Sequence, residues 1–318
     1  MGKPLEGRIA LVAGATRGAG RGIATALGEA GATVYCTGRS VRGRPATGNR
    51  PETIEETAEL VTARGGRGIA VRVDHTVEQE VQGLAERVRR EAGRLDVLVN
   101  DIWGGDSLLV FNEPFWRQSP ANGRLMFERG VFTHLLTSRY LVPLMVERNA
   151  GLVVEITDGD TFGYRGTLWY DLVKMTVIRA AFGMALELRK TGVTALAVTP
   201  GFLRSEEMLE HFGVTEANWR DGAKKDPNFI ASESPAYVGR AVAALAADPH
   251  VGRKSGRVFS SWDLAREYGF TDADGSQPHW AEHFARAFGK AYPAADEAAY
   301  AAWRDGPAER SMSDWPQW

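Results

Sequence analysis

The stretch RIALVAGATRGAGRGIATALGEAGATVYCTG, residues 8–38, carries the pattern that decides the fold. A short apolar run leads into a turn with three glycines, Gly14, Gly18 and Gly20, and then into a helix-length segment and a second apolar run. Glycines at such a turn let the backbone approach a diphosphate, whose charge then lies at the N-terminus of the following helix. Since the turn lies between a strand and a helix, the stretch predicts a dinucleotide site, which the glycines by themselves would support only weakly.

The alternation of short apolar runs with helix-length segments continues to residue 261. Runs that are apolar on both faces indicate a parallel sheet covered by helices on both sides. We therefore expect an α/β fold over residues 1–275, in one domain with a Rossmann-type doubly wound parallel sheet. The seven expected strands are residues 8–14, 32–38, 67–74, 95–101, 151–157, 193–200 and 256–261.

The region after Gly275 changes character, because no further strand signal follows. We expect residues 276–318 to form a helical extension, which either packs over the domain or takes part in a subunit contact. Its tryptophans are Trp280, Trp303, Trp315 and Trp318.

The composition narrows the class of protein. A net charge of −2 gives no reason to expect nucleic acid or an acidic membrane surface as a partner. No apolar stretch is long enough to span a membrane, and the N-terminal apolar run is too short for a signal peptide. The single cysteine, Cys36, excludes an intrachain disulfide and suits a reducing compartment, so we expect a cytoplasmic enzyme. His279 and His283 have a metal-like spacing without a third ligand nearby, and we expect no metal.

The end of the second expected strand indicates which dinucleotide is bound. An NAD site usually places Asp or Glu there to bind the ribose 2′-hydroxyl. This chain instead has Gly38-Arg39, with Arg17 inside the glycine turn. A guanidinium pairs with a 2′-phosphate, whereas a carboxylate repels it. The two arginines therefore favour NADP(H).

Together with Tyr170-x-x-x-Lys174 and Pro200-Gly201, these motifs resemble those of the short-chain dehydrogenase/reductase family over about residues 5–270. The resemblance implies that Asp74 contacts the adenine and that Ser205 contacts the carboxamide of the cofactor. It also implies a small-molecule substrate and a homodimer or homotetramer. The cofactor-binding residues that we expect are Gly14, Thr16, Arg17, Gly18, Gly20, Arg39, Asp74, Asn100, Lys174, Pro200, Gly201 and Ser205.

Tyr170 and Lys174 match the catalytic pair of the family. Residues four apart lie on one face of a helix, so the two side chains can converge. A free tyrosine has a pKa of about 10, and a nearby ammonium is expected to lower it by favouring the phenolate. We expect Tyr170 to donate a proton to the reduced atom as hydride arrives, and Lys174 also to hold the ribose hydroxyls of the nicotinamide half.

The chain departs from the family pattern at two positions around this pair. Asn100 matches the first residue of the family's Asn-Asn-Ala-Gly segment, but Asp101 and the bulky Trp103 follow it. Gly130 falls where many members carry the helix Asn of a catalytic tetrad. A proton relay through that Asn is therefore absent or is replaced by water.

A third departure is the missing catalytic serine, for whose place Thr157 and Asp158 compete. Thr157 lies thirteen residues before Tyr170, a common family spacing, and would keep a hydroxyl group. A gapless match of the strand GLVVEIT instead puts Asp158 on the serine, on the same strand face as Ile156. We favour Asp158, because loops absorb deletions more easily than strands change register.

The expected substrate is bulky and largely apolar, because aromatic residues surround the catalytic pair in the sequence. The segment of residues 202–232 is long and mixed in composition, as expected for a substrate lid. Our first hypothesis is reduction of an apolar ketone or aldehyde. The alternative is reduction of a cyclic imine with Asp158 stabilising the iminium, and a non-catalytic dinucleotide-binding protein is disfavoured by the intact Tyr170 and Lys174. The expected substrate-binding residues are Trp103, Phe162, Trp169 and Phe202.

Overall fold

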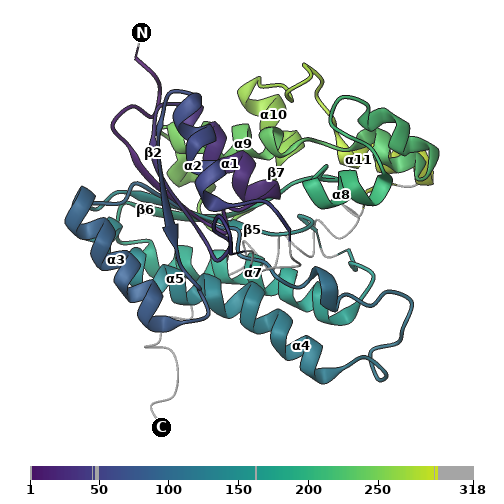
Figure 1. Cartoon of the computed structure of the whole chain (residues 1–318), viewed down its shortest axis with the longest axis horizontal. Helices are drawn as coiled ribbons and strands as arrows, with labels where there is room; N and C mark the ends of the chain where they lie inside the picture. Colours follow the sequence, from purple (N-terminus) through teal and green to yellow (C-terminus); the bar gives the residue numbers. More distant parts are fainter. Residues whose placement is uncertain (1, 45, 47–49, 162, 290, 293–318) are drawn as a thin grey trace.

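The computed structural model describes residues 2–44, 46, 50–161, 163–289 and 291–292. Seven strands form one sheet in the order β3-β2-β1-β4-β5-β6-β7, and every neighbouring pair is parallel (Figure 1). This order confirms the doubly wound sheet expected from the sequence, and it reverses direction between β1 and β4. The strands are β1 (Ile9–Ala13), β2 (Thr33–Gly38), β3 (Arg67–Arg72), β4 (Val97–Asn100), β5 (Gly151–Ile156), β6 (Val193–Thr199) and β7 (Val258–Ser260).

Alternate residues of each strand enter two different cores, because successive side chains of a strand point to opposite faces. In β1, Ala10 and Val12 pack into one core, and Leu11 and Ala13 pack into the other. Both sets are fully buried, which explains why the strands are apolar throughout. The first core lies under α1 (Gly18–Glu29), α2 (Ile54–Ala63), α9 (Pro235–Ala247) and α10 (Ser261–Tyr268); the second lies against α3 (Glu78–Ala92), α5 (Thr133–Leu141), α6 (Pro143–Val146) and α7 (Leu168–Leu188) (Figure 1).

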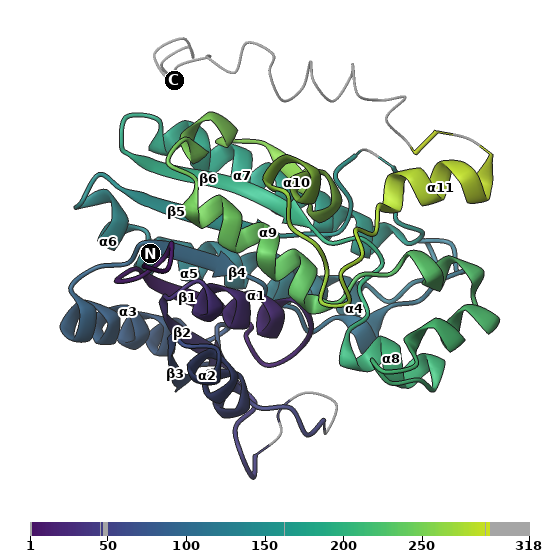
Figure 2. The same ribbon diagram turned by 90° about the horizontal axis from the view of Figure 1, so that it is seen from above.

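Several of the remaining helices lie together at one end of the sheet. Seen from above, α4, α8 and α11 gather at that end (Figure 2). Ligands of open parallel sheets bind beyond the carboxyl ends of the strands, where the strand order reverses. The elements outside the two helical layers are η1 (Asp106–Leu108), α4 (Pro120–Phe127), the π-helical turn η2 (Glu128–Phe132), α8 (Glu206–Phe212), η3 (Trp219–Lys224), η4 (Pro227–Ala231), η5 (Val251–Lys254) and α11 (Trp280–Phe288).

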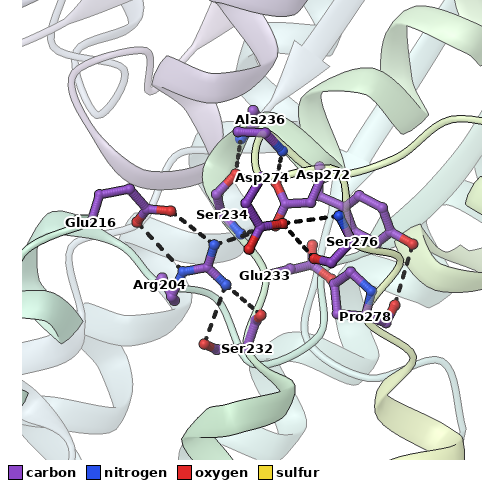
Figure 3. A network of polar contacts seen from close by, with 12 residues as sticks. Arg204, Glu216, Ser232, Glu233, Ser234, Ala236, Asp272, Asp274, Ser276 and Pro278 are labelled. Carbon is purple, nitrogen blue, oxygen red and sulfur yellow. Dashed lines mark hydrogen bonds and ion pairs between the residues drawn. The ribbon is translucent and has the colours of Figure 1, made fainter. Parts of the chain in front are cut away.

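A buried ion pair holds the two ends of segment 202–232 together (Figure 3). The guanidinium of Arg204 lies 3.4 Å from Asp272 Oδ2 and donates to the backbone oxygen of Ser232. Asp272 in turn accepts a hydrogen bond of 2.8 Å from the backbone amide of Ser234. The side chains of Arg204 and Asp272 are both 0% exposed. The base of the segment is therefore fixed to the turn at residue 272.

Helix α11 confirms the start of the expected helical extension. Trp280 packs against the core formed by Tyr237 and Trp262, and its ring centroid lies 5.9 Å from that of Phe202. The remaining tryptophans, Trp303, Trp315 and Trp318, fall outside the described residues. Over the part of the chain that the structure describes, none of the helices combines the length and apolar character needed to cross a bilayer.

Candidate active site

A cavity of about 700 Å³ extends from the glycine turn to the side chains of Tyr170 and Lys174. Gly20, Asn100 and Trp169 lie outside its lining, and Phe162 falls outside the described residues. The cavity therefore brings together most of the residues expected from the sequence. Those that line it are Gly14, Thr16, Arg17, Gly18, Arg39, Asp74, Trp103, Thr157, Asp158, Tyr170, Lys174, Pro200, Gly201, Phe202 and Ser205.

The glycine turn forms a backbone cradle at the start of α1, and side chains at Gly14 and Gly20 would collide with backbone atoms. Gly14 has a φ of +92°, and a Cβ atom there would lie 2.3 Å from the backbone oxygen of Asp101. A Cβ atom on Gly20 would lie 2.3 Å from the backbone oxygen of Gly14. Gly20 thus lets α1 start directly against the turn, although it does not line the cavity. The cradle at the start of α1 fits a dinucleotide diphosphate.

The two arginines expected at the adenosine end already pair with carboxylates. Arg39 Nη1 lies 3.7 Å from Asp74 Oδ2, and Arg17 Nη1 lies 3.2 Å from Glu52 Oε2. Burial by itself would raise the pKa of Asp74, but hydrogen bonds from Thr76 and the charge of Arg39 keep it below the usual value. A 2′-phosphate would therefore share these guanidinium groups with acids of the protein.

Asp158, and not Thr157, faces the hydroxyl of Tyr170. Tyr170 donates a hydrogen bond of 2.8 Å to Asp158 Oδ2, whereas the Thr157 hydroxyl donates to the backbone oxygen of Lys174 at 2.8 Å. In β5, Val154 and Ile156 pack into the same core, and Asp158 continues this two-residue period. Thr157 accordingly attaches the strand to α7, and the place opposite the tyrosine holds a carboxyl group.

The expectation that Lys174 lowers the pKa of Tyr170 is wrong for this arrangement. Burial, followed by the charge and hydrogen bond of Asp158, raises the pKa of Tyr170 well above 10. Burial also lowers the pKa of Lys174 from its ordinary value of 10.5, against the charges of Asp158 and Asp101. Tyr170 therefore retains its proton at neutral pH, which is the form that a proton donor requires.

Trp103 occupies the space beside Gly130. A Cβ atom on Gly130 would lie 2.9 Å from the indole ring of Trp103, so a larger residue at position 130 would collide with it. The indole Nε1 donates to Asp106 Oδ1 at 2.7 Å, and the ring centroid lies 4.6 Å from Lys174 Nζ. At this distance the face of the ring stabilises the ammonium group. An indole therefore fills the position where the family resemblance implied an asparagine.

The charges of three carboxyl groups act on Lys174. Asp158, Asp101 and Asp106 each raise its pKa by their charge, in opposition to burial. Burial raises the pKa of Asp101 to about 7, although the charge of Lys174 and the backbone amide of Gly20 act against this increase. Asp106 was not expected from the sequence, because nothing in its spacing relates it to the catalytic pair.

Asn100 was wrongly expected to contact the cofactor, since its side chain points into the structure beneath the cavity. Its amide nitrogen donates to Ser138 at 2.9 Å and to Glu155 at 2.7 Å. Glu155 lies 2.6 Å from His134 Nδ1, and the other ring nitrogen of His134 lies 2.9 Å from the backbone oxygen of Ile102. This buried network holds the loop that carries Asp101 and Trp103.

Trp169 is also placed differently from its expected role in substrate binding. Its indole packs against α4 so closely that a Cβ atom on Gly123 would lie 2.6 Å away, and it contacts the core of Met126 and Val173. Residue 169 lies next to Tyr170, and adjacent residues of a helix point in different directions. Phe202, in contrast, lines the cavity and packs against Phe229 with ring centroids 5.3 Å apart.

Similarity to known proteins agrees with this arrangement. The short chain dehydrogenase family model matches residues 8–214. The chain is 38% identical over 277 residues to dehydrogenase/reductase SDR family member 1 of Mus musculus, covering 86% of this chain and 85% of the relative. It is 30% identical over 207 residues to the ketoacyl reductase HetN of a Nostoc species, covering 64% and 66%.

A crystal structure of a short chain dehydrogenase from Mycobacterium thermoresistibile has the same fold, with a TM-score of 0.72 and 20% sequence identity. The match covers 87% of this chain and 92% of that structure. The extent of these similarities, together with the sheet order and the cavity at its reversal point, identifies the chain as a member of the short-chain dehydrogenase/reductase family, whose oxidoreductases use a nicotinamide dinucleotide.

Proposed function

We propose that this protein is an NADP(H)-dependent reductase of a carbon–nitrogen double bond in a bulky, largely apolar substrate. The hydrogen bond of 2.8 Å from Tyr170 to Asp158 carries the proposal. It places a carboxyl group beside the expected proton donor, where the resemblance to the family implied a serine. When bound, the cofactor supplies a hydride to the electron-poor carbon of the substrate. Trp103, Phe111 and Phe202 offer apolar surface in the cavity for such a substrate.

The charge of Asp158 favours a nitrogen over an oxygen as the reacting heteroatom. Reduction of a carbonyl places negative charge on the oxygen, which a carboxylate repels, whereas a protonated imine carries positive charge. Two unit charges 4 Å apart interact by about 4 kcal/mol at an effective dielectric constant of 20, so the sign of this interaction has a large effect. Asp101 and Asp106 add further carboxyl groups near Lys174.

Tyr170 would supply the proton that the reduction requires. The proton would reach the substrate nitrogen first and give an iminium, whose positive charge Asp158 would balance. The neighbouring carbon would then gain the hydride, so that one C=N double bond becomes a C–H and an N–H bond of a neutral amine, and the tyrosinate would regain a proton from solvent. The hydroxyl of Tyr170 must turn from Asp158 towards the nitrogen for this transfer.

Reduction of a ketone or aldehyde is the second candidate, because the 30% identical relative is named a ketoacyl reductase. This reaction would require Asp158 in its protonated form, in which it donates a hydrogen bond to the carbonyl oxygen. Reduction of an imine would depend on the ionised carboxylate instead.

We predict that Asp158→Ser shifts the ratio of kcat/KM for cyclic imines to kcat/KM for ketones towards ketones by at least about tenfold. The hydroxyl removes the repulsion of the oxyanion, and one charge-assisted hydrogen bond contributes about 1.5–3 kcal/mol. Oxidation of NADPH by panels of both substrate classes measures the ratio. Asp158→Asn, which removes the charge but keeps the size, should shift it in the same direction. An unchanged ratio in both variants would contradict the imine proposal.

We further propose that Arg39 and Arg17 select NADP(H) over NAD(H). Arg39→Asp should weaken NADPH binding far more than NADH binding, because each lost charge-assisted contact contributes about 1.5–3 kcal/mol. Arg42→Asp is the matched control, since Arg42 is paired with the exposed Glu59. The Kd of each cofactor follows from fluorescence titration of the purified protein. Equal affinity of the unmutated protein for both cofactors would refute the proposed selectivity.

A homodimer or homotetramer in the cytoplasm is also proposed. Large apolar side chains are exposed on η2, α5 and α7, at Phe132 (64%), Leu135 (41%) and Leu172 (39%). Their burial against a second copy would remove this apolar surface from water. Cys36 is buried and carries a free thiol, which suits a reducing compartment.

A further inference from the structure

Glu206, at the start of α8, reaches from segment 202–232 to the glycine turn. Its Oε2 atom accepts a hydrogen bond of 2.7 Å from the backbone amide of Gly18, the first residue of α1. Its Oε1 atom lies 3.7 Å from Nε of Arg21. The two ends of this contact are 188 residues apart in the sequence. A carboxylate of the lid therefore binds the N-terminus of the helix that follows the first strand.

This contact caps the N-terminus of α1, which the residues at the start of the helix do not cap with their own side chains. Arg17, which precedes the helix, makes no side-chain hydrogen bond to the helix N-terminus, and the first turn of α1 contains no acidic residue. Backbone amides at a helix N-terminus lack partners within the helix, and the helix dipole favours negative charge there. Glu206 supplies both the acceptor and the charge.

Gly18 also lines the cavity, at the part of the glycine turn where the cofactor diphosphate is expected, whereas Glu206 itself lies outside the lining. A carboxylate and a phosphate are both anionic acceptors of backbone hydrogen bonds. An amide that donates its hydrogen to the carboxylate is therefore not free to donate it to the phosphate. Two anions in one cradle also repel each other. Glu206 would therefore compete with the diphosphate for the same hydrogen-bond donor.

We propose that Glu206 is an internal anion that binds the Gly18 amide beside the diphosphate position of the glycine turn, and that the cofactor must displace it from this amide. Displacement would release α8 from α1, so binding of the cofactor would alter the position of the lid above the cavity. Glu206 would thereby reduce the affinity for the cofactor and stabilise the cofactor-free protein.

The contacts around α8 indicate which part of the lid would move. Glu210, on the same helix, pairs with Arg50 at 2.6 Å, but its side chain is 73% exposed and holds the helix only weakly. The base of the lid is held by the buried pair of Arg204 and Asp272 (Figure 3). Phe212 of α8 stacks on the buried Phe229 with ring centroids 4.1 Å apart, so we expect α8 to move together with this cluster while the base stays in place.

The test compares Glu206→Gln with Glu207→Gln in the full-length protein. Glu206→Gln removes the competing charge but keeps the side-chain size, so the Kd for NADPH should fall by roughly three- to tenfold, the effect of one carboxylate at a helix N-terminus. The same variant should have a lower Tm without cofactor and a larger rise in Tm when NADPH is added. Glu207→Gln removes an equal charge from the next position. It should change the Kd for NADPH and the Tm clearly less than Glu206→Gln does.

Hydrogen exchange gives an independent readout on the unmutated protein, since NADPH should increase exchange of the amides of α8 and not of the segment around Asp272. A weaker affinity for NADPH in Glu206→Gln, or an unchanged Kd and Tm, would overturn the proposal. Failure of the unmutated protein to bind NADPH or NADH would overturn it as well, and would identify the dinucleotide site itself as the failed assumption.

Discussion

Replacing Tyr170 by Phe is expected to lower kcat by about 10²- to 10⁴-fold, the usual contribution of a general acid. The variant should bind NADPH nearly as tightly as the unmutated protein, because the phenol acts only in the chemical step. Burial and Asp158 raise the pKa of Tyr170 well above 10, so the hydroxyl holds its proton at neutral pH. The phenylalanine ring fills the same space without a proton to donate.

Turnover and cofactor affinity, measured together, separate this role from a structural one. Lys174→Ala should impair both, since we assign Lys174 a contact with the cofactor ribose as well as its position beside Tyr170. Because the pKa of Tyr170 is raised, its ionisation should leave turnover unaffected throughout the neutral range. A near-normal kcat of the phenylalanine variant on the best substrate would show that another acid donates the proton.

The fold and the position of Asp158 opposite Tyr170 were predictable because they depend on local periodicity. Strands buried on both faces produce apolar runs that are visible in the sequence, and all seven expected strands occur in the sheet. The two-residue period of β5 also separates Asp158 from Thr157, which point in opposite directions. Both features can be predicted from residues that are neighbours in the sequence.

Other features of the site depend on tertiary packing and could not be predicted. The direction of the Asn100 amide is determined by Ser138 and Glu155, which lie 38 and 55 residues away in the sequence. The pKa of Tyr170 is dominated by burial, which a spacing of four residues does not reveal. Glu206 follows Ser205 directly, yet its contact with Gly18 exists only in the folded chain.

Replacing Asp272 by Ala is expected to lower the free energy of unfolding by about 3 kcal/mol, because the buried Arg204 then keeps only the half-exposed Glu216 as a charged partner. The side chains of Asp272 and Arg204 are both 0% exposed, and Asp272 also accepts hydrogen bonds from Ser234 (Figure 3). Burial raises the pKa of Glu233 to about 8, so this neighbouring acid is mostly neutral at pH 7 and does not replace the lost charge.

Asp274 is a matched control two residues further along the chain. It pairs with Arg220 at 2.9 Å, but the side chains are 25% and 61% exposed, so Asp274→Ala should cost no more than about 1 kcal/mol. Urea unfolding at neutral pH measures both values. Equal losses in the two variants would show that the buried pair does not hold the lid base.

The double variant Arg204→Met/Asp272→Leu distinguishes an unpaired charge from a general loss of packing. Replacing a whole buried ion pair by apolar residues of similar size is often neutral or stabilising, because no buried charge is left without a partner. The double variant should therefore recover much of the stability that Asp272→Ala loses. Glu216, which also pairs with Arg204 at 2.8 Å, is 48% exposed and can be hydrated when the guanidinium is removed. If the double variant is as unstable as the single one, the hydrogen bonds of Asp272 to Ser234, rather than its charge, hold the base of the lid.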